Sequence, residues 1–345
     1  MRLPMENISL VQGLAIPQNS VITVRDIFPL GGEGWHYLRL VFHNDYTDST
    51  GTGPILLGGY KIVHNITLRT SKNEQIVSMP GKGWYYLNWI LNASQPVHDE
   101  LALATAVYDA VIDIPLSHGL LARKEDLALD SGRYNSIELE ITLGGVADLI
   151  TAVTGDTNTT TVDISLCRNK SCFEKSGKPL ALPFIKSLPP RRVADGYIEI
   201  ESAEDLTLFG FIACCHSMDA GAGEVPCPGV PFSGISADWL DDLTFRDNVI
   251  SYLRLLQLDW FRQERRNYAD VDHPDTVLAV APGVTPDDTL RGIYPYVFIR
   301  EGSIFNGYWT GQKSEVRLEW NPVALGGVID PQVDVIIFGM REMRE

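Results

Sequence analysis

Cysteine, histidine and aspartate are the residues of this chain that could bind a metal ion. Cys214, Cys215 and His216 are consecutive, and Cys227 follows in the same region, which supplies the thiolate and imidazole ligands that zinc prefers. Consecutive residues of a β-strand point to opposite faces, however, so Cys214 and Cys215 cannot easily share one tetrahedral site. The pattern therefore favours buried free thiols over a zinc centre.

A second group of candidate ligands is the acidic segment at residues 270–275, which reads Asp-Val-Asp-His-Pro-Asp. Its density of carboxylates is that of a calcium loop, but the glycine at the sixth position and the closing glutamate of such a loop are missing. A solvated loop is the favoured interpretation. We predict no metal ion and no cofactor.

The sequence lacks the motifs of the common enzyme classes. It contains no P-loop, no complete dinucleotide fingerprint, no G-x-S-x-G and no H-E-x-x-H. Its 7 histidines are scattered singly and suggest no nucleophile–base pair. We predict a protein that is not an enzyme, with no catalytic, cofactor-binding or metal-binding residues. A glycosidase-type pair of carboxylates would leave no trace in sequence, which keeps a carbohydrate-active alternative open.

The cysteines also bear on the redox compartment. Cys167 and Cys172 flank a short polar segment, so a hairpin disulfide between them could form under oxidation. An odd number of cysteines, 5, in a chain of 345 residues favours a reducing compartment instead. Free thiols are the default expectation.

The composition describes a chain that can bury a core but is ill suited to coating nucleic acid. Hydrophobic residues make up 45% and charged residues 21%, as in globular proteins. Asp and Glu number 44 against 28 Lys and Arg, for a net charge of −16. Because phosphate binding needs a basic surplus, we expect no direct nucleic-acid binding. No apolar run is long enough for a transmembrane helix.

The elements that must position these side chains are mostly β-strands. Runs of branched and aromatic residues separated by turn-forming clusters predict them, at residues 21–24, 35–42, 62–70, 107–116, 137–143, 161–166, 197–201, 206–215, 243–246, 294–300, 316–320 and 333–338. A helical or irregular insert is expected at residues 83–92. A longer helix is predicted over residues 249–266, where Val249, Tyr252, Leu253 and Leu256 recur at helical spacing.

Short matches between the two halves of the chain indicate an internal repeat. They keep their order and a nearly constant separation, and pair residues 21–24 with 197–200, 40–43 with 213–216, 67–69 with 244–246, 86–87 with 252–253, 137–140 with 316–319, 144–145 with 326–327, and 162–164 with 333–335. The repeat predicts an N-terminal arm (1–19), a first β-sandwich (20–174), a Pro-rich linker (175–196) and a second β-sandwich (197–345). His43 and His216 fall at equivalent positions, which indicates a shared packing role.

The fold that suits these features is all-β, with two tandem eight-stranded jelly rolls, a helical insert and long loops at residues 217–237 and 269–292. Such a chain resembles the double jelly-roll major capsid proteins of tailless icosahedral DNA viruses, the lineage of adenovirus and the membrane-containing bacteriophages. The resemblance rests on the tandem repeat, the helical insert after the third strand and the large loops of the second copy. Residues 108–117 and 134–143 look like late strands of the family's first jelly roll.

The resemblance implies a homotrimer that forms a pseudo-hexameric capsomer of an icosahedral virion shell, assembled in the host cytoplasm. It implies as partners the neighbouring capsomers, penton or minor capsid proteins and, through the arm at residues 1–19, an inner viral membrane. The arm carries only Arg2 as a basic residue, which argues against a strong electrostatic grip on anionic lipid.

Two other classes fit the sequence. One is a two-sandwich carbohydrate-binding or carbohydrate-active protein, and the other is a viral spike or minor capsid protein. The 7 tryptophans are expected in the core more than at an interface, although aromatic anchors are typical of interfaces; they are Trp35, Trp84, Trp89, Trp239, Trp260, Trp309 and Trp320.

Overall fold

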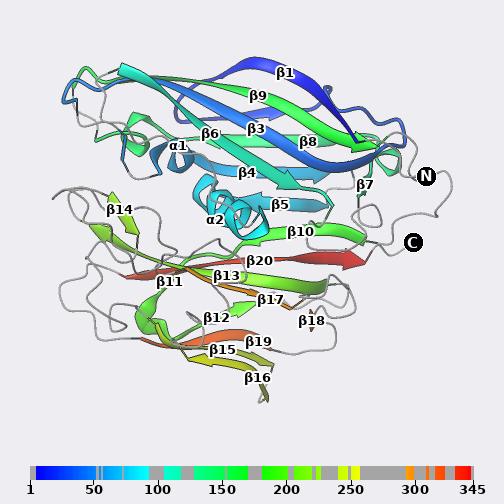
Figure 1. The fold of residues 1–345 in the computed structure, drawn as a ribbon, viewed down its shortest axis with the longest axis vertical. Helices are drawn as coiled ribbons and strands as arrows, with labels where there is room; N and C mark the ends of the chain where they lie inside the picture. Colours follow the sequence, from blue (N-terminus) through cyan, green and yellow to red (C-terminus); the bar gives the residue numbers. More distant parts are fainter. Residues whose placement is uncertain are drawn as a thin grey trace.

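The computed structural model describes most of the chain. The described residues are 5–51, 54–55, 57–71, 74–92, 105–117, 128–151, 154–169, 181–200, 206–219, 223–226, 240–247, 250–256, 293–298, 308–310, 315–322 and 331–342. They form three sheets, and the strands of the largest sheet follow one another along the long axis of the molecule (Figure 1).

The first two layers form one jelly roll. The outermost sheet has the order β1-β9-β3-β6, made of β1 (Glu6–Ile16), β9 (Thr157–Asn169), β3 (Gly34–Thr47) and β6 (Thr105–Pro115), with the short β7 (Leu129–Asp130) on β3. The facing layer has the order β2-β8-β4-β5, made of β2 (Ser20–Val24), β8 (Ile137–Leu143), β4 (Val63–Thr70) and β5 (Gln75–Met79). The chain passes repeatedly between the two sheets, and the consecutive strands β4 and β5 pair with each other in the second one, which is the double-sheet pattern of a jelly roll.

The second jelly roll repeats this topology strand for strand. Its first sheet runs β10-β20-β13-β17, made of β10 (Ala181–Ser187), β20 (Gln332–Glu342), β13 (Leu206–Asp219) and β17 (Ile293–Val297). Three short strands add to it: β11 (Arg191–Arg192), β14 (Gly223–Pro226) and β18 (Tyr308–Trp309). Its second sheet runs β12-β19-β15-β16, made of β12 (Tyr197–Ile200), β19 (Val316–Pro322), β15 (Leu240–Asp247) and β16 (Ile250–Leu256).

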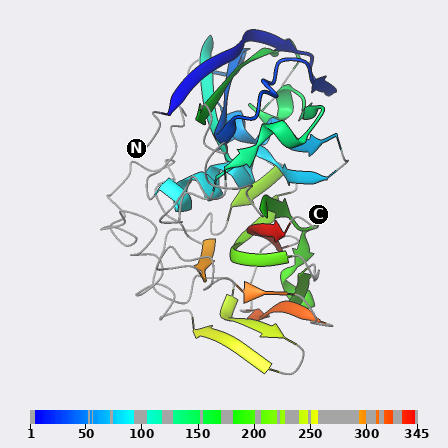
Figure 2. The same cartoon turned by 90° about the vertical axis from the view of Figure 1, so that its right-hand side faces the viewer.

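The two jelly rolls are joined through a shared sheet. Strand β10 pairs in parallel with β5, where Ile185 is opposite Val77 and Lys186 is opposite Ser78. This pairing makes one 11-stranded sheet that begins in the first jelly roll and ends in the second. Figure 2, turned by a quarter turn about the vertical axis, shows the two halves one above the other.

The helices in the described ranges are short and lie at this junction or in loops. The longest, α2 (Gly81–Asn92), directly follows β5 and buries Trp84 and Leu87. The others are α1 (Gly58–Lys61) and the 3-10 turns η2 (Ser131–Arg133), η3 (Val146–Asp148) and η4 (Val193–Asp195). None of the helices in the described part of the chain combines the length and apolar character that a membrane-spanning helix requires.

Alternation of apolar and polar residues fixes the strands to their sheets. In β8 the side chains of Ile137, Leu139, Ile141 and Leu143 are buried, and the residues between them are partly exposed, because successive strand side chains point to opposite faces. The buried side chains form two hydrophobic clusters. One fills the first jelly roll and extends onto β13 and β20, and the other fills the second jelly roll.

The predicted repeat is confirmed at the level of topology. Five of the seven matched pairs fall on equivalent strands, namely β2 with β12, β3 with β13, β4 with β15, β8 with β19, and β9 with β20. The match of residues 86–87 with 252–253 is wrong, because it aligns α2 with β16. Residues 326–327, in the remaining match, lie outside the described residues.

The helix predicted over residues 249–266 is wrong in its first part. Residues Ile250–Leu256 form β16, antiparallel to β15, with Asp247 opposite Ile250 and Asp242 opposite Leu256. Two residues separate the strands, which is the favoured loop length of a β-hairpin. A short apolar run fits both helical and strand spacing, and the pairing with β15 decides between them. Residues 257–266 lie outside the described residues, whereas the insert predicted at residues 83–92 is helical, as part of α2.

Two segments assigned to an arm and a linker contribute strands. Residues Glu6–Ile16 form β1, which pairs along β9 from Glu6 opposite Arg168 to Ile16 opposite Thr160. Residues Ala181–Ser187 form β10, which pairs with β20 along its whole length. The last described strand of the first jelly roll ends at Asn169, and the first described strand of the second begins at Ala181.

Candidate functional site

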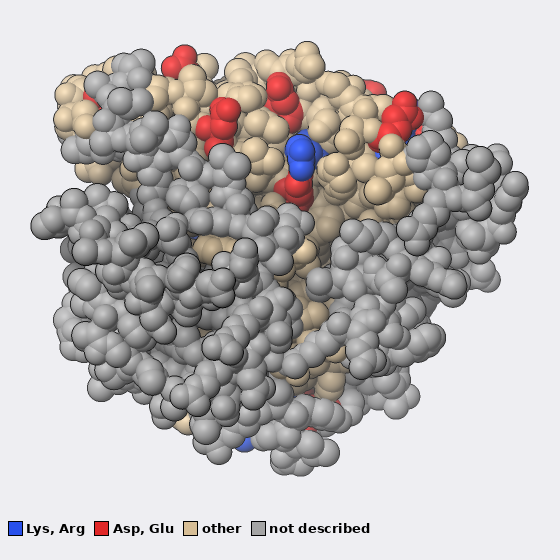
Figure 3. Space-filling model, in the orientation of Figure 1, with Lys and Arg blue, Asp and Glu red and all other residues tan. Residues whose placement is uncertain are grey.

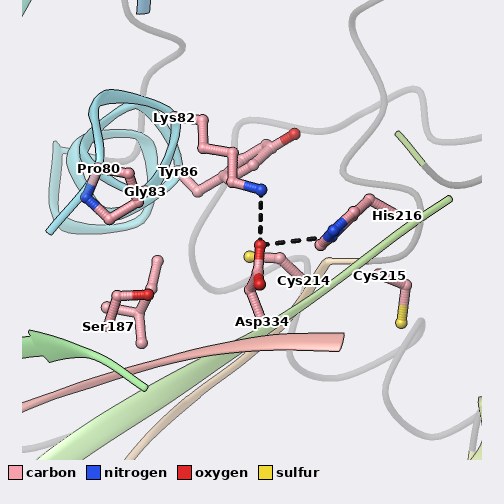
Figure 4. A pocket seen from close by; sticks show the side chains of 10 residues that line it. Pro80, Lys82, Gly83, Tyr86, Ser187, Cys214, Cys215, His216 and Asp334 are labelled. Atoms are coloured by element: carbon pink, nitrogen blue, oxygen red, sulfur yellow. Dashed lines mark ion pairs between the residues drawn. The ribbon is translucent and has the colours of Figure 1, made fainter. Parts of the chain in front are cut away.

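A small pocket lies where α2 of the first jelly roll meets β13 and β20 of the second. Lys82 Nζ is 2.7 Å from Asp334 Oδ2, and His216 Nδ1 is 3.3 Å from the same oxygen. Figure 4 shows the three side chains converging from three elements. The pocket is lined by Pro80, Lys82, Gly83, Tyr86, Ser187, Cys214, Cys215, His216, Asp334 and Ile336.

Local sequence brings these groups together. Lys82 lies in the first turn of α2, just after Pro80. A side chain at Gly83 would place its Cβ 2.7 Å from Met79 Cγ and 3.3 Å from Ile336 Cδ1, so glycine allows α2 to approach β20 closely. Asp334 stands opposite Cys214 in the β13–β20 ladder. The three side chains of the junction therefore come together because α2 of the first jelly roll packs closely on a sheet of the second.

The three charged or titratable groups of the junction are largely buried. The exposed fractions of the side chains are 20% for Lys82, 11% for Asp334 and 8% for His216. Removing an ion pair from water is costly, so such a pair fixes a specific arrangement more than it adds stability. Lys82 and Asp334 neutralise each other. Their role in this geometry is to hold α2 in register on β20.

The same histidine–aspartate arrangement occurs in both jelly rolls. His43 on β3 is opposite Thr161, and Asp163 lies two residues further along β9. His216 on β13 is opposite Gln332, and Asp334 lies two residues further along β20. The Nε2 atom of His43 is 3.4 Å from Asp163 Oδ2. The repeat thus preserves a diagonal cross-strand pair, within reach of such neighbours in a sheet.

The two pairs differ in environment. His43 is about one third exposed and also pairs with Asp109, whose Oδ1 is 2.8 Å from Nδ1. Burial lowers the pKa of His43, but hydrogen bonds to Asp109 and Asp163 and their charges raise it by more, so its pKa lies above the ordinary value. In the second jelly roll, the space over the pair is taken by Lys82. One pair is enclosed within the chain, and its counterpart faces outward.

The prediction of buried cysteines outside disulfides is confirmed for the three cysteines that the structure describes. Cys214 and Cys215 are buried cysteines outside any disulfide, on opposite faces of β13, one in each hydrophobic cluster. Cys167 is also free and buried. Burial raises the pKa of its thiol, against a hydrogen bond with Tyr37 that lowers it. Cys172, Cys227 and residues 270–275 lie outside the described residues, so the calcium loop cannot be placed, whereas the free thiol of Cys167 matches the default expectation and not the hairpin disulfide. Within the described ranges, no group of three or more Cys, His, Asp or Glu side chains could hold a metal ion.

The tryptophans whose burial the structure describes are in the core, as predicted. The side chains of Trp35, Trp84, Trp89 and Trp320 are buried. Trp309 belongs to β18, and Trp239 and Trp260 lie outside the described residues. Lys82 and Asp334 are not anticipated from sequence as site residues. A signal for Asp334 was present, because the matched triplets Val-Asp-Ile and Val-Asp-Val place it at the position of Asp163.

Comparison with known structures places the fold. No protein-family model matches the sequence, and no curated protein matches it significantly. Solved structures of viral major capsid proteins are nevertheless similar over nearly the whole chain. The major capsid protein of Sulfolobus turreted icosahedral virus gives a TM-score of 0.66 at 10% identity, covering 98% of this chain and 96% of that one.

Two further structures agree with this likeness. The major capsid protein of bacteriophage PM2 gives a TM-score of 0.61 at 10% identity, covering 99% of both chains. The PBCV-1 virus capsid gives 0.62 at 9% identity, covering 98% of this chain and 94% of that one. The protein therefore has the double jelly-roll fold of major capsid proteins, as predicted. These similar structures are all of viral capsid proteins.

Proposed function

We propose that this protein is a major capsid protein that associates as a homotrimer, so that six jelly rolls form a pseudo-hexameric capsomer of an icosahedral virion shell. The observation that carries the proposal is the coverage of the fold. The chain matches 94–99% of three capsid subunits as well as 98–99% of itself. The likeness therefore extends over two complete jelly rolls and their order, beyond the single jelly roll that many unrelated proteins contain.

The physical properties of the chain suit a subunit that folds alone and then assembles. A net charge of −16 keeps free subunits soluble, and assembly follows when large interfaces outweigh the repulsion. A stable interface needs to bury more than about 1,000 Å². The described surface offers an apolar group for such contacts on β6, where Val107 is 50% exposed.

The proposal extends to partners and location. The trimer would contact neighbouring capsomers and penton or minor capsid proteins in the virion, after assembly in the host cytoplasm. An inner viral membrane would be met through the N-terminal segment, part of which is β1. Nucleic acid is not among the proposed partners, because the acidic surplus opposes phosphate binding.

Light scattering on the purified protein tests the homotrimer. One chain has a mass of 38.3 kDa, so a trimer has three times that mass, 114.9 kDa. We expect the larger mass at micromolar concentration and hexagonal, six-lobed particles in electron micrographs. A strict monomer at that concentration, with no six-lobed particles, would overturn the proposed function.

A further inference from the structure

The sheet that caps the first jelly roll has one face with no covering element in the described structure. We define the outer face as the outward side chains of three neighbouring strands: Arg39, Val41 and His43 on β3, Asp109 on β6, and Asp163 and Ser165 on β9. These residues are intermediate or exposed, whereas Leu40, Phe42 and Ile164, which alternate with them, are fully buried. Figure 3 shows several acidic side chains and little basic surface on the upper described part of the molecule.

The equivalent face of the second jelly roll is covered, and helix α2 of the first jelly roll lies on it. Strand β13 replaces β3 and strand β20 replaces β9 in the repeat. On that face Ile212, Cys214, Ile336 and Phe338 are buried in the hydrophobic cluster of the first jelly roll. Lys82 of α2 contacts Asp334, the counterpart of Asp163. In one of its two copies, therefore, this face is an interface for a neighbouring jelly roll.

The sheet edges repeat the same relationship. Within the chain, β5 at the end of one sheet pairs with β10 at the end of the next. The counterpart of β5 is β16 and the counterpart of β10 is β1, and both are end strands of the sheets that the described residues form. Unpaired strand edges are templates for pairing with another chain. Strands β5 and β10 pair with each other within the chain. The equivalent edges, those of β16 and β1, have no such pairing among the described residues.

We propose that the outer face and the edge of β1 bind the second jelly roll of another copy of this chain, with β16 of that copy beside β1, in the arrangement that the two jelly rolls have within one chain. The inference rests on the proposed function, which it deepens by assigning the contact surface and its orientation. The contact is head-to-tail, because two different surfaces meet. Repeated head-to-tail contacts close into a ring when the rotation allows it.

Side-chain chemistry supports a contact between chains that fold first and associate later. Ile212, Ile336 and Phe338 occupy the covered face, and Arg39, Ser165 and Cys167 hold the equivalent positions on β3 and β9. A face that must stay soluble before assembly is expected to be more polar than one enclosed from the start. The surplus of carboxylates, Asp109 and Asp163 beside His43, matches a basic group from the partner, as Lys82 matches Asp334. It also disfavours a phosphate-bearing occupant, since like charges repel.

Arginine substitutions on the outer face provide the main test. Val41→Arg places a long cation where the counterpart, Cys214, is buried under α2. Val21→Arg is the matched control, because Val21 on β2 is 58% exposed and its counterpart Tyr197 remains 43% exposed within the chain. Ser165→Arg is a second outer-face variant, whose counterpart Ile336 is 1% exposed. Mass is measured by light scattering, and thermal unfolding shows which variants are folded.

We expect wild type and Val21→Arg to form trimers and folded Val41→Arg and Ser165→Arg to remain at 38.3 kDa. Hydrogen exchange should also show increased protection of the amides of Glu6–Ile16 in the trimer relative to the monomeric variants. If wild type is a trimer but either folded outer-face variant is also a trimer, or if β1 gains no protection, the assigned surface is overturned and the proposed function stands. If wild type is a monomer, the proposed function fails and this inference with it.

Discussion

His216 Nδ1 lies 3.3 Å from Asp334 Oδ2 across β13 and β20, at the junction of the two jelly rolls. His43 and Asp163 hold the same diagonal relationship across β3 and β9, with 3.4 Å between Nε2 and Oδ2. The same cross-strand pair therefore occurs in both jelly rolls in two different settings. In the second jelly roll Lys82 is a third member of the group. The junction thus adds a charged contact from α2 to an arrangement that the fold already contains.

Asp334 is expected to stabilise the junction through this contact. Asp334→Ala removes the carboxylate that faces Lys82 and His216, and should lower the free energy of unfolding by about 1–3 kcal/mol, the usual cost of stranding a buried polar partner. Urea unfolding measures the change. Glu138→Ala is the control, because Glu138 pairs with Arg25 at 3.2 Å on the surface, where the side chains are 33% and 58% exposed. Its expected cost is about 0–1 kcal/mol, and equal costs for the two variants would contradict the assignment.

His43 should make the stability of the protein depend on pH. Its pKa is raised in the folded state above the ordinary value of 6.5. The extra stability is therefore fully present below the unfolded pKa and is lost as the pH rises through the folded pKa. Asp109→Asn removes the hydrogen bond and charge that raise this pKa most. We expect the variant to be destabilised relative to wild type at a pH of about 6 and little changed at a pH of about 8.5.

Titration of the His43 ring by NMR gives a direct check on the same variant. Its midpoint should move to lower pH in Asp109→Asn, because only the more distant Asp163 remains to favour the protonated ring. Asp195→Asn is a suitable control, since Asp195 caps η4 in the second jelly roll and does not contact His43. An unchanged midpoint in the Asp109 variant would rule out the proposed cause of the shift.

Cys167 should be a slow nucleophile. Burial raises the pKa of its thiol, and the thiolate is the reactive form. Iodoacetamide at a pH of about 8 should therefore modify the peptide containing Cys167 slowly in the folded protein and readily after denaturation. Ser9→Cys on β1 introduces an exposed thiol as an internal standard. Equal rates at the two cysteines in the folded chain would show that burial does not control this thiol.

The topology could be predicted from the sequence because a strand with one buried face shows alternating apolar and polar residues. The alternation of Ile137, Leu139 and Ile141 gives β8 directly, and the same holds for its counterpart β19. Strand β1 is different, because it lies at a sheet edge and its apolar residues Ile8, Leu10, Val11 and Leu14 are only partly buried against the core. Its alternation is interrupted by register shifts between Ser9 and Val11 and between Val11 and Leu14, and its residues were expected in an arm. Edge position, rather than weak strand character, conceals it.

Strand β10 was not predicted from the sequence for another reason. It includes Pro183, and proline normally argues against a strand because it cannot donate a ladder hydrogen bond. Here β10 pairs with β20 along its whole length but with β5 only at Ile185 and Lys186, so one side of Pro183 lies outside the second ladder. The junction site was equally inaccessible, because Lys82 and Asp334 come from opposite halves of the chain. Only the matched positions of Asp163 and Asp334 pointed to it.

Gly339 tests whether the close approach of β13 to β20 is required. An alanine Cβ at this position would lie 2.1 Å from the carbonyl oxygen of Thr207 and 2.9 Å from Leu208 Cα. Both are backbone atoms beside a β-bulge between Leu208 and Gly210, so they cannot move aside as a flexible side chain would. Gly339→Ala should cost about 1–3 kcal/mol, as overpacking does. Gly31→Ala is the matched control, because nothing lies within 4 Å of its added Cβ, and it should be neutral or stabilise by up to about 1 kcal/mol. Equal urea midpoints for the two variants would show that the strands separate at little cost.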